Sequence, residues 1–275
     1  MDAFLNKAKK IQTIEEASAL LWEQIPSPLP ATTQALELSL EAHKGQIRKS
    51  GEPYIVHPIL VAAITAKISN DEMMVQAALL HDVVEDTSYT IEDLEREFGY
   101  DVAHMVEGLT KIVEIRDEEL VPSGSDERLI NSALSFRKML IASIKDVRVL
   151  VIKLCDRLHN MLTLDALSAE KQRRIAEETL VVYAPIAHRL GISRLKNHLE
   201  DLSFYYIYPD DYKEIDTYIT SNAQNLKFKL NAFIQNVKET MAKDGFKEGE
   251  FDIIGRVKHY YSIYLKMHRK GISIE

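Results

Sequence analysis

The residues best suited to chemistry begin at the pair His81-Asp82, which follows the apolar run Ala77–Leu80 and precedes Glu85 and Asp86. Residues four positions apart share one face of a helix. A helix continuing through this segment would therefore place each residue of the pair beside one of the two later carboxylates. Imidazole and carboxylate ligands suit divalent transition ions such as Mn, Fe or Zn. Such an ion lowers the pKa of bound water and polarises a phosphoryl oxygen, which favours metal-assisted hydrolysis.

A second polar cluster lies on the segment Val151–Thr163. Its polar residues recur at intervals of three, four and three positions, and so share one helical face: Lys153, Asp156, Asn160 and Thr163. The neighbouring face is apolar and consists of Leu150, Leu154, Leu158 and Met161. A polar stripe on so apolar a helix needs a partner, which is either solvent or a binding site.

Each of these features also has a structural explanation. An adjacent His-Asp pair is common, and a single Asp156 would be unremarkable as a cap or in a salt bridge. Glu85 and Asp86 are compatible with an ordinary solvated helix end. His57, just before a helix that starts near Pro58, is a further candidate. By spacing alone, a metal site and a set of structural roles are about equally supported.

The elements that must position these residues are predicted to be mostly helices. Apolar residues recur at helical spacing over Ile11–Gln24, Ala31–His43, Ile59–Ile68, a helix from Asn70 or Asp71 to Asp86, and Asp101–Thr110. Later helices are predicted over 126–144, Val147–Met161, Ala169–His188, Arg194–Ser203 and, as one long helix, Tyr212–Lys243. Thr90 and Asp93 resemble a capping box for a short helix ending near Gly99.

Three segments depart from the helical pattern. Lys44–Tyr54, with two glycines and a proline, predicts a loop. Glu114–Asp126 is acidic and aperiodic, and also predicts a loop. Near the end of the chain, Phe251–Val257 predicts a strand and Tyr261–Arg269 a helix.

Composition narrows the class of protein. A hydrophobic fraction of 46% with 28% charged residues excludes general disorder. The net charge of −8 makes a general nucleic-acid binder a poor candidate. Cys155 is the only cysteine, so an intrachain disulfide is impossible. Because no apolar run has membrane-spanning length and the N-terminus lacks the layout of a signal peptide, we expect a cytoplasmic protein.

Five motifs follow one another in a fixed order: Arg48–Pro58, His81–Thr87, Asp156–Met161, Tyr183–Ile192 and Glu200–Phe204. Together they resemble the HD-domain metal phosphohydrolases, and more closely the hydrolase domain of the long RelA/SpoT homologues. Enzymes of that family make and degrade (p)ppGpp, the guanosine alarmone of the stringent response. The resemblance implies an all-α fold: an HD-domain helical bundle, followed by a long linker helix and an incomplete α/β segment.

The resemblance implies four parts along the chain. Residues 1–30 would form an N-terminal helix and a Pro-rich break, 31–205 the HD-type (p)ppGpp hydrolase domain, 206–248 a helical linker and 249–275 the truncated start of a synthetase domain. In that last part, Arg256 and Lys258 match positions that contact ATP phosphates, and Tyr260 departs from a usual Pro. No counterpart of the synthetase's catalytic Asp and Glu is present, so we expect no alarmone synthesis. Synthetase and regulatory regions are expected in the full-length protein.

The resemblance also implies roles at the reaction centre. The residues that match four protein ligands of a Mn²⁺ ion are His57, His81, Asp82 and Asp156. Glu85 and Asp86 match an acidic pair that handles the hydrolytic water.

Other residues match positions that contact the nucleotide. Arg48 corresponds to the basic residue that packs on the guanine base, with Lys49 and Ser50 beside it. Asn160 and Thr163 match positions that line the nucleotide pocket. A phosphate contact by Lys153 or Lys111 is a weaker expectation of our own.

These assignments predict a Mn-dependent guanosine-3′,5′-bis(diphosphate) 3′-diphosphatase, which converts ppGpp or pppGpp to GDP or GTP plus pyrophosphate. Two residues depart from the family pattern within the hydrolase motifs: Leu162 stands where Arg is usual, and Cys155 replaces a small Ala. Leu162 leaves open an HD-family phosphatase acting on another nucleotide. A non-catalytic, alarmone-binding regulatory module is the third hypothesis. Neither a membrane nor a nucleic acid is expected as a partner.

Overall fold

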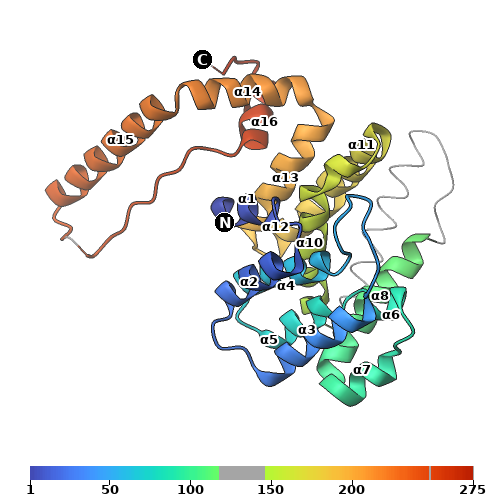
Figure 1. The fold of residues 1–275 in the computed structure, drawn as a ribbon. Helices are drawn as coiled ribbons and strands as arrows, with labels where there is room; N and C mark the ends of the chain where they lie inside the picture. The colour runs from blue at the N-terminus through green and yellow to red at the C-terminus, as the bar shows by residue number, and fades with distance from the viewer. Residues whose placement is uncertain (118–145, 248, 275) are drawn as a thin grey trace. The chain divides into compact units, whose positions relative to one another are not determined.

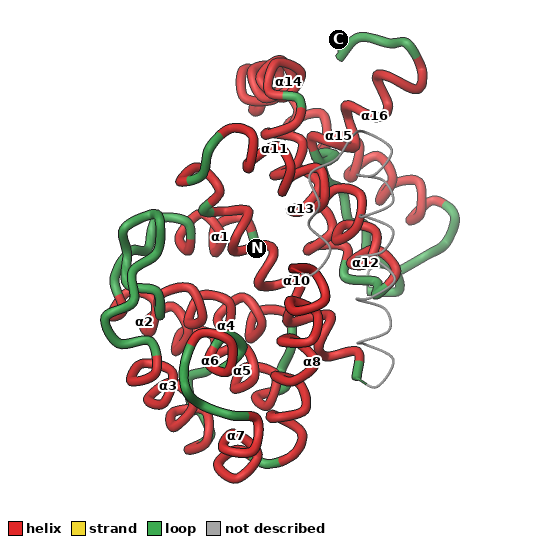
Figure 2. Tube along the Cα trace, turned by 90° about the vertical axis from the view of Figure 1, so that its right-hand side faces the viewer, coloured by secondary structure: helices red, strands yellow, loops and turns green. Residues whose placement is uncertain are grey.

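The computed structural model describes residues 1–117, 146–247 and 249–274, with residues 112–117 described by their backbone alone (Figure 1). The chain divides into two compact units, Met1–Leu202 and Ser203–Glu275. All named elements within the described ranges are helical (Figure 2). The one β-type pairing in those ranges is an isolated bridge between Ile47 and Pro53. The same residues include no helix that is both long and apolar enough to span a membrane.

The first unit is built from short and medium helices. In its first half these are α1 (Asp2–Ala8), α2 (Ile14–Gln24), α3 (Pro30–Ala42), α4 (Val56–Ile68), α5 (Glu72–Leu79), α6 (Val83–Asp86), α7 (Ile91–Phe98) and α8 (Tyr100–Asp117). In its second half they are α10 (Val147–Leu162), the 3₁₀ turn η1 (Leu164–Ala166), α11 (Ala169–Glu178), the π-helical turn η2 (Thr179–Tyr183), α12 (Ala184–Arg189) and most of α13 (Ser193–Ile207).

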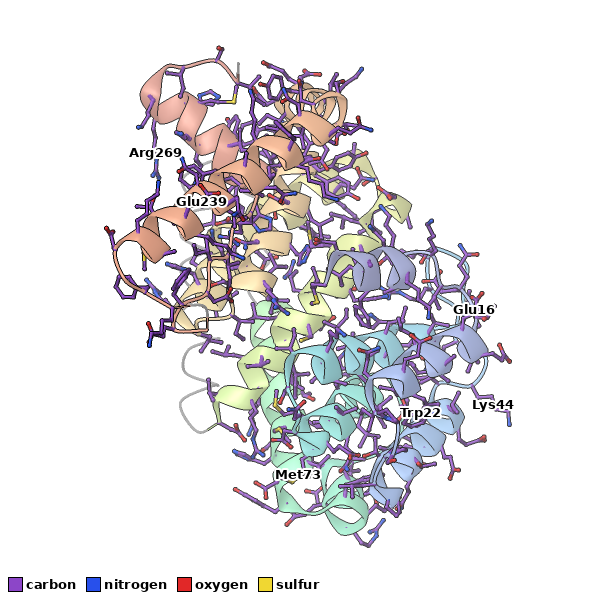
Figure 3. All side chains as sticks on the ribbon, turned by 90° about the vertical axis from the view of Figure 1, so that its left-hand side faces the viewer. Glu16, Trp22, Lys44, Met73, Glu239 and Arg269 are labelled. Atoms are coloured by element: carbon purple, nitrogen blue, oxygen red, sulfur yellow. The ribbon has the colours of Figure 1, made fainter. Side chains whose placement is uncertain are left out.

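The core of this unit lies around α4, which packs against α2, α5 and α10. The α4 sequence is apolar on every face, which is typical of a helix surrounded by protein. Its side chains Ile59, Leu60 and Ile64 are at most 1% exposed. Polar residues on outer elements, such as Glu16 and Lys44, lie at the surface (Figure 3). Side chains at the start of α4 therefore project into a region from which water is excluded.

The predicted loop between α3 and α4 is confirmed and tightly held. Gly45 and Gly51 have φ angles of 80° and 100°, in the left-handed region that favours glycine. Across the loop, the Arg48 N–H donates to the Glu52 carbonyl and the Tyr54 N–H donates to the Gln46 carbonyl, both at 2.9 Å. These bonds fix the backbone that presents the side chains preceding α4.

The helix predicted to run to Asp86 is instead broken after α5. The His81 imidazole Nδ1 lies 2.8 Å from the carbonyl oxygen of Ala78. In a continuous helix that carbonyl would accept from the N–H of Asp82, so the side chain competes with the backbone. Helical structure resumes at Val83 as the single turn α6. The expectation of one helical face shared by His81 and Glu85 was therefore wrong, and the His-Asp pair lies in the turn.

Helix caps were predicted more accurately. Thr90 and Asp93 form the expected capping box of α7, which ends at Gly99. Asp71, one of the two residues predicted as candidates for this cap, caps α5. The cap of α10 is Asp146, and Arg148 at the start of that helix contacts this carboxylate and those of Asp71 and Asp101 at 2.8, 3.5 and 3.1 Å. The start of α10 is thus tied to α5 and α8.

The second unit comprises the end of α13, α14 (Pro209–Ser221), α15 (Ala223–Lys243) and α16 (Tyr260–Lys270). The predicted long helix Tyr212–Lys243 is instead two helices that meet at Asn222, whose side-chain amide donates to the Tyr218 carbonyl at 2.9 Å. Phe204 packs among tyrosine rings, including Tyr264 at 4.7 Å between centroids.

The predicted strand Phe251–Val257 is wrong, whereas the helix predicted over Tyr261–Arg269 is confirmed as α16. A lone strand leaves its backbone groups without a ladder, and no described segment pairs with this one. Its backbone instead lies against α15, where a Cβ on Gly255 would be 2.8 Å from Leu230 Cδ1. The described residues therefore show no α/β synthetase segment.

Two predictions concern the segment between α8 and α10. The first four residues of the predicted loop Glu114–Asp126 belong to the end of α8. The rest of that loop and the helix predicted over 126–144 lie outside the described residues.

Candidate metal centre

Three of the predicted metal ligands come together in the first unit. His57 projects from the first turn of α4, and His81 and Asp82 from the turn between α5 and α6. One ligand atom from each lies within 4.8 Å of the other two. The Asp82 Oδ2 is 3.1 Å from His81 Nε2 and 3.8 Å from His57 Nε2. The cluster therefore brings two imidazoles and a carboxylate to one point.

Asp156, the fourth predicted ligand, borders this cluster from α10. Its Oδ1 lies 3.2 Å from His57 Nε2, although Asp156 is not part of the mutually close group of three. Its other contacts come from its own helix, since Lys153 Nζ lies 2.9 Å from Oδ2 and Asn160 Nδ2 donates to Oδ1 at 2.6 Å. Three residues of the predicted polar stripe of α10 are thus connected through their side chains: Lys153, Asp156 and Asn160.

The hydrogen bonding of the His81 ring leaves one of its nitrogens available to bind a cation. Because Nδ1 donates to the Ala78 carbonyl, the neutral ring has its lone pair on Nε2. This Nε2 is buried and makes no hydrogen bond to any described residue, and its approach to Asp82 is outside hydrogen-bond geometry. A lone pair facing a carboxylate is unfavourable unless a proton or a metal ion lies between them. Burial lowers the pKa of His81, but Asp82 outweighs it and raises the pKa to about 9.

The charges of the surrounding groups also suit a divalent ion. Burial and the nearby Arg48 guanidinium lower the pKa of His57 to about 4, so its imidazole is neutral. Burial opposes ionisation of Asp82 and Asp156, but His81 and Lys153 respectively hold the pKa of each carboxyl below its usual value. The site thus offers a neutral imidazole and two carboxylates.

The acidic pair Glu85 and Asp86 lies on α6, directly after the His-Asp turn. Both side chains are more exposed than the metal-ligand candidates beside them, although the Glu85 carboxyl is still partly shielded from water. Partial burial and the negative charge of Asp82 raise the pKa of Glu85 to about 7. Gln46 of the preceding loop donates to the Asp86 carbonyl at 3.2 Å and so joins α6 to that loop.

The predicted nucleotide contacts divide into two sets. Arg48 and Asn160 come together, since the guanidinium donates to the amide oxygen at 3.0 Å. Lys49 and Ser50 are exposed on the loop, and Thr163 follows the last residue of α10, its hydroxyl donating to the His159 carbonyl at 3.3 Å. The loop before α4 and the end of α10 thus meet at Arg48.

The two departures from the family pattern are both buried. Leu162 is 5% exposed and Cys155 is fully covered. Burial raises the pKa of the Cys155 thiol to about 12, which leaves it unreactive near neutral pH. Both side chains belong to the core.

Sequence reasoning missed two residues that contact the predicted ligands. The Tyr54 hydroxyl donates to Asp82 Oδ2 at 2.7 Å. The Nδ1 of His159 lies 2.8 Å from the Nδ1 of His57. Both residues fall inside the recognised motifs, and His159 follows Asp156 by three positions, which places them on one helical face. That spacing was the available signal.

Comparison with protein families defines the class of this protein. The family described as HD domain matches residues 35–193, which is more than half of the chain. The chain therefore belongs to the HD-domain family. Its similarities to individual proteins narrow this to the hydrolase region of the RelA/SpoT type.

Three relatives illustrate that similarity. A Myxococcus xanthus protein named GTP pyrophosphokinase is 43% identical over 91% of this chain. A Synechocystis protein named probable guanosine-3′,5′-bis(diphosphate) 3′-pyrophosphohydrolase is 43% identical over 92%. The Escherichia coli K12 bifunctional (p)ppGpp synthase/hydrolase SpoT is 42% identical over 85%. Each match covers 32% of the relative, so the chain spans about a third of their length.

Among the solved structures that match this chain is one described as "A metazoan ortholog of SpoT hydrolyzes ppGpp and plays a role in starvation responses". It shares 27% identity with this chain and covers 64% of it and 86% of its own length, with a TM-score of 0.42. A TM-score this low does not bear on the fold.

Proposed function

We propose that this region hydrolyses the 3′-diphosphate of guanosine alarmones, converting ppGpp or pppGpp to GDP or GTP and pyrophosphate. The observation that supports it most is the cluster of His57, His81 and Asp82, in which a buried imidazole nitrogen faces a carboxylate without a hydrogen bond. Relatives of this chain are named for the same reaction. The hydrolase domain would span 31–205, followed by a linker over 206–248 and the start of a synthetase domain over 249–275.

The metal would be Mn²⁺, held by His57, His81, Asp82 and Asp156. The ligand types alone also admit Fe or Zn, and the choice of Mn²⁺ rests on the family resemblance. When bound, the cation lowers the pKa of a coordinated water and polarises the phosphoryl group. Tyr54 would orient Asp82 through the hydrogen bond to its Oδ2.

The acidic pair on α6 would handle the water. A general base is most effective when its pKa is near the working pH, and the pKa of Glu85 is raised to about 7. In this scheme Glu85 takes a proton from the water and Asp86 helps to orient it. The water oxygen would bond to the phosphorus attached to the ribose 3′ oxygen, and the bond between that phosphorus and the ribose oxygen would break. The proton taken up by Glu85 would pass to the ribose oxygen, so that GDP or GTP and pyrophosphate are released.

The loop before α4 and the end of α10 would hold the nucleotide. The Arg48 guanidinium, fixed by Asn160, would pack on the guanine base as a cation over a π face. Lys49, Ser50 and Thr163 would line the same pocket. Because the chain has a net charge of −8, attraction of the anionic substrate has to be local. Binding of ppGpp is therefore expected to weaken as salt rises.

The test is pyrophosphate release from ppGpp with added Mn²⁺, comparing the wild-type chain with Asp156→Ala. Asp165→Asn, at an exposed carboxylate paired with Lys9, is the matched control. We expect turnover by wild type and control, and none by Asp156→Ala or with a chelator. Binding of ppGpp without turnover by wild type would instead indicate a regulatory module. Turnover of other nucleotides but not of ppGpp would indicate a different HD phosphatase.

A further inference from the structure

The contacts behind the metal centre draw attention to His159, which has no role in the function proposed above. This residue lies on α10 and is 1% exposed. Its Nδ1 is 2.8 Å from His57 Nδ1 and 3.4 Å from an Arg48 guanidinium nitrogen. Its Nε2 is buried and makes no hydrogen bond within the described residues. The polar contacts of the ring are thus concentrated at Nδ1.

Two neutral imidazole nitrogens at this distance share one proton, so one ring donates and the other accepts. His57 can offer Nε2 to a cation only if its own proton is on Nδ1. In that arrangement His57 donates and His159 accepts, with the remaining proton of His159 on Nε2.

The opposite arrangement would oppose metal binding. If His159 donated, His57 would have its proton on Nε2, directed at Asp156 Oδ1 3.2 Å away. The lone pair that a metal needs would then be absent. Arg48 discriminates between the two arrangements, because a guanidinium only donates. An Arg48 N–H facing His159 Nδ1 favours a lone pair on that nitrogen, which is the arrangement that leaves His57 Nε2 free for a metal.

We propose that His159 is a positioning residue: oriented by Arg48, it accepts the Nδ1–H of His57 and keeps the Nε2 lone pair of His57 directed at the metal. The inference rests on the metal site of the proposed function. Residues that orient a metal-binding histidine in this way typically change metal affinity by about 10–100-fold when they are replaced.

Three variants separate this role from a merely structural one. Asn places its amide oxygen near the position of Nδ1, so His159→Asn keeps an acceptor for His57. Gln places its amide near Nε2, so His159→Gln retains a polar side chain but removes that acceptor, and His159→Leu removes all polar contacts. Mn²⁺ affinity is measured calorimetrically on the metal-free chain without substrate. We expect about 10–100-fold weaker binding by the Gln and Leu variants, and a smaller loss by the Asn variant.

Folding of each variant is checked by circular dichroism and thermal unfolding without metal. Equal Mn²⁺ affinity in all the folded proteins, or equal losses for Asn and Gln, would overturn the inference while leaving the metal site intact. Failure of the wild-type chain to bind Mn²⁺ would overturn the proposed function as well.

A second measurement needs no variant. ¹⁵N NMR of the wild-type histidines with Zn²⁺, a diamagnetic probe, reports which ring nitrogen is protonated. We expect His57 Nδ1 to be protonated and His159 Nδ1 to be unprotonated in the metal-loaded chain. The reverse assignment would overturn the inference.

Discussion

The two units of the chain bury different kinds of side chain. In the described part of the first unit, buried ionisable groups include His57, His81 and Asp156. In the described part of the second unit, the buried residues are Ser203, Phe204, Ile207 and Ile215, and none of the side chains of α15 and α16 is buried. Burying an ionisable group costs free energy unless it is paired or binds a metal. Because such groups are concentrated in the first unit, we expect the chemistry of this chain to be located there.

Ionic contacts, some of them buried, also hold α10 in place in the first unit. The Arg157 guanidinium lies 3.8 Å from the centre of the Tyr183 ring and 3.0 Å from a Glu178 oxygen. Arg148 contacts three carboxylates at the other end of the helix. The helix that supplies Asp156 and His159 is thus fixed at both ends. In contrast, Phe228 and Phe233 of α15 are 73% and 66% exposed.

The largest expected difference between the units is in metal binding. His81→Ala removes the imidazole whose Nε2 faces Asp82, so we expect loss of measurable Mn²⁺ binding and of ppGpp hydrolysis. Asp216→Asn in the second unit, at a carboxylate that accepts from Tyr260, is expected to change neither. Calorimetric titration with Mn²⁺ measures the effect. Retained Mn²⁺ binding by His81→Ala would contradict the assignment of the metal site to the first unit.

A second prediction separates binding from chemistry within the first unit. Glu85→Gln retains the shape and polarity of the side chain but cannot accept a proton from water. We expect kcat to fall by about 10²–10⁴-fold, because that is the usual contribution of a positioned acid or base. Mn²⁺ affinity is expected to be unchanged. Steady-state kinetics with parallel metal titration tests this, and an unchanged kcat would exclude Glu85 as the base.

The third prediction concerns packing. Leu79 is fully buried in α5, so Leu79→Ala is expected to lower the free energy of unfolding by about 2–5 kcal/mol. Phe228→Ala on exposed α15 is expected to change it by no more than about 0.5 kcal/mol. Denaturant unfolding of the whole chain compares the two. A larger effect at Phe228 would show that α15 is packed more extensively than its exposure indicates.

The smallest predicted effect is a dependence of stability on pH. Burial opposes ionisation of Asp146, but hydrogen bonds from Arg148 hold its pKa below the usual 3.8. A lowered native pKa contributes stability above the pKa of the unfolded state and loses it as pH falls through the native pKa. Asp146→Asn, which retains a helix-capping side chain, is expected to remove this contribution of less than about 1 kcal/mol. The measurement is urea unfolding between roughly pH 3 and 6, the range in which carboxyl groups titrate. The free energy of unfolding of the variant should depend less steeply on pH than that of the wild type. The same pH dependence in the wild type and in Asp146→Asn would contradict this prediction.

Helices and caps could be predicted from the sequence because their signals are local. Apolar spacing located α10, Pro58 indicated the first turn of α4, and Thr90 with Asp93 marked the start of α7. The break after α5 could not be predicted from spacing, because it depends on a side-chain bond from His81 to a backbone carbonyl. The strand predicted over Phe251–Val257 was wrong because a strand needs a neighbour, which no local pattern supplies.

The candidate site shows the same division between local and long-range information. The motifs identified His57, His81 and Asp82, which the structure brings together. The contact between His57 and His159 joins residues 102 positions apart, so it could not be predicted from spacing along the sequence. Tyr54 was missed for a similar reason, since its partner Asp82 lies 28 positions away.

The most direct test of the metal centre is anomalous X-ray diffraction from crystals of the chain grown with Mn²⁺, recorded on either side of the manganese absorption edge. We predict one strong peak within bonding distance of the Nε2 atoms of His57 and His81 and of a carboxylate oxygen of Asp82, with Asp156 as the fourth protein ligand. A peak elsewhere, or none at this cluster, would contradict the account.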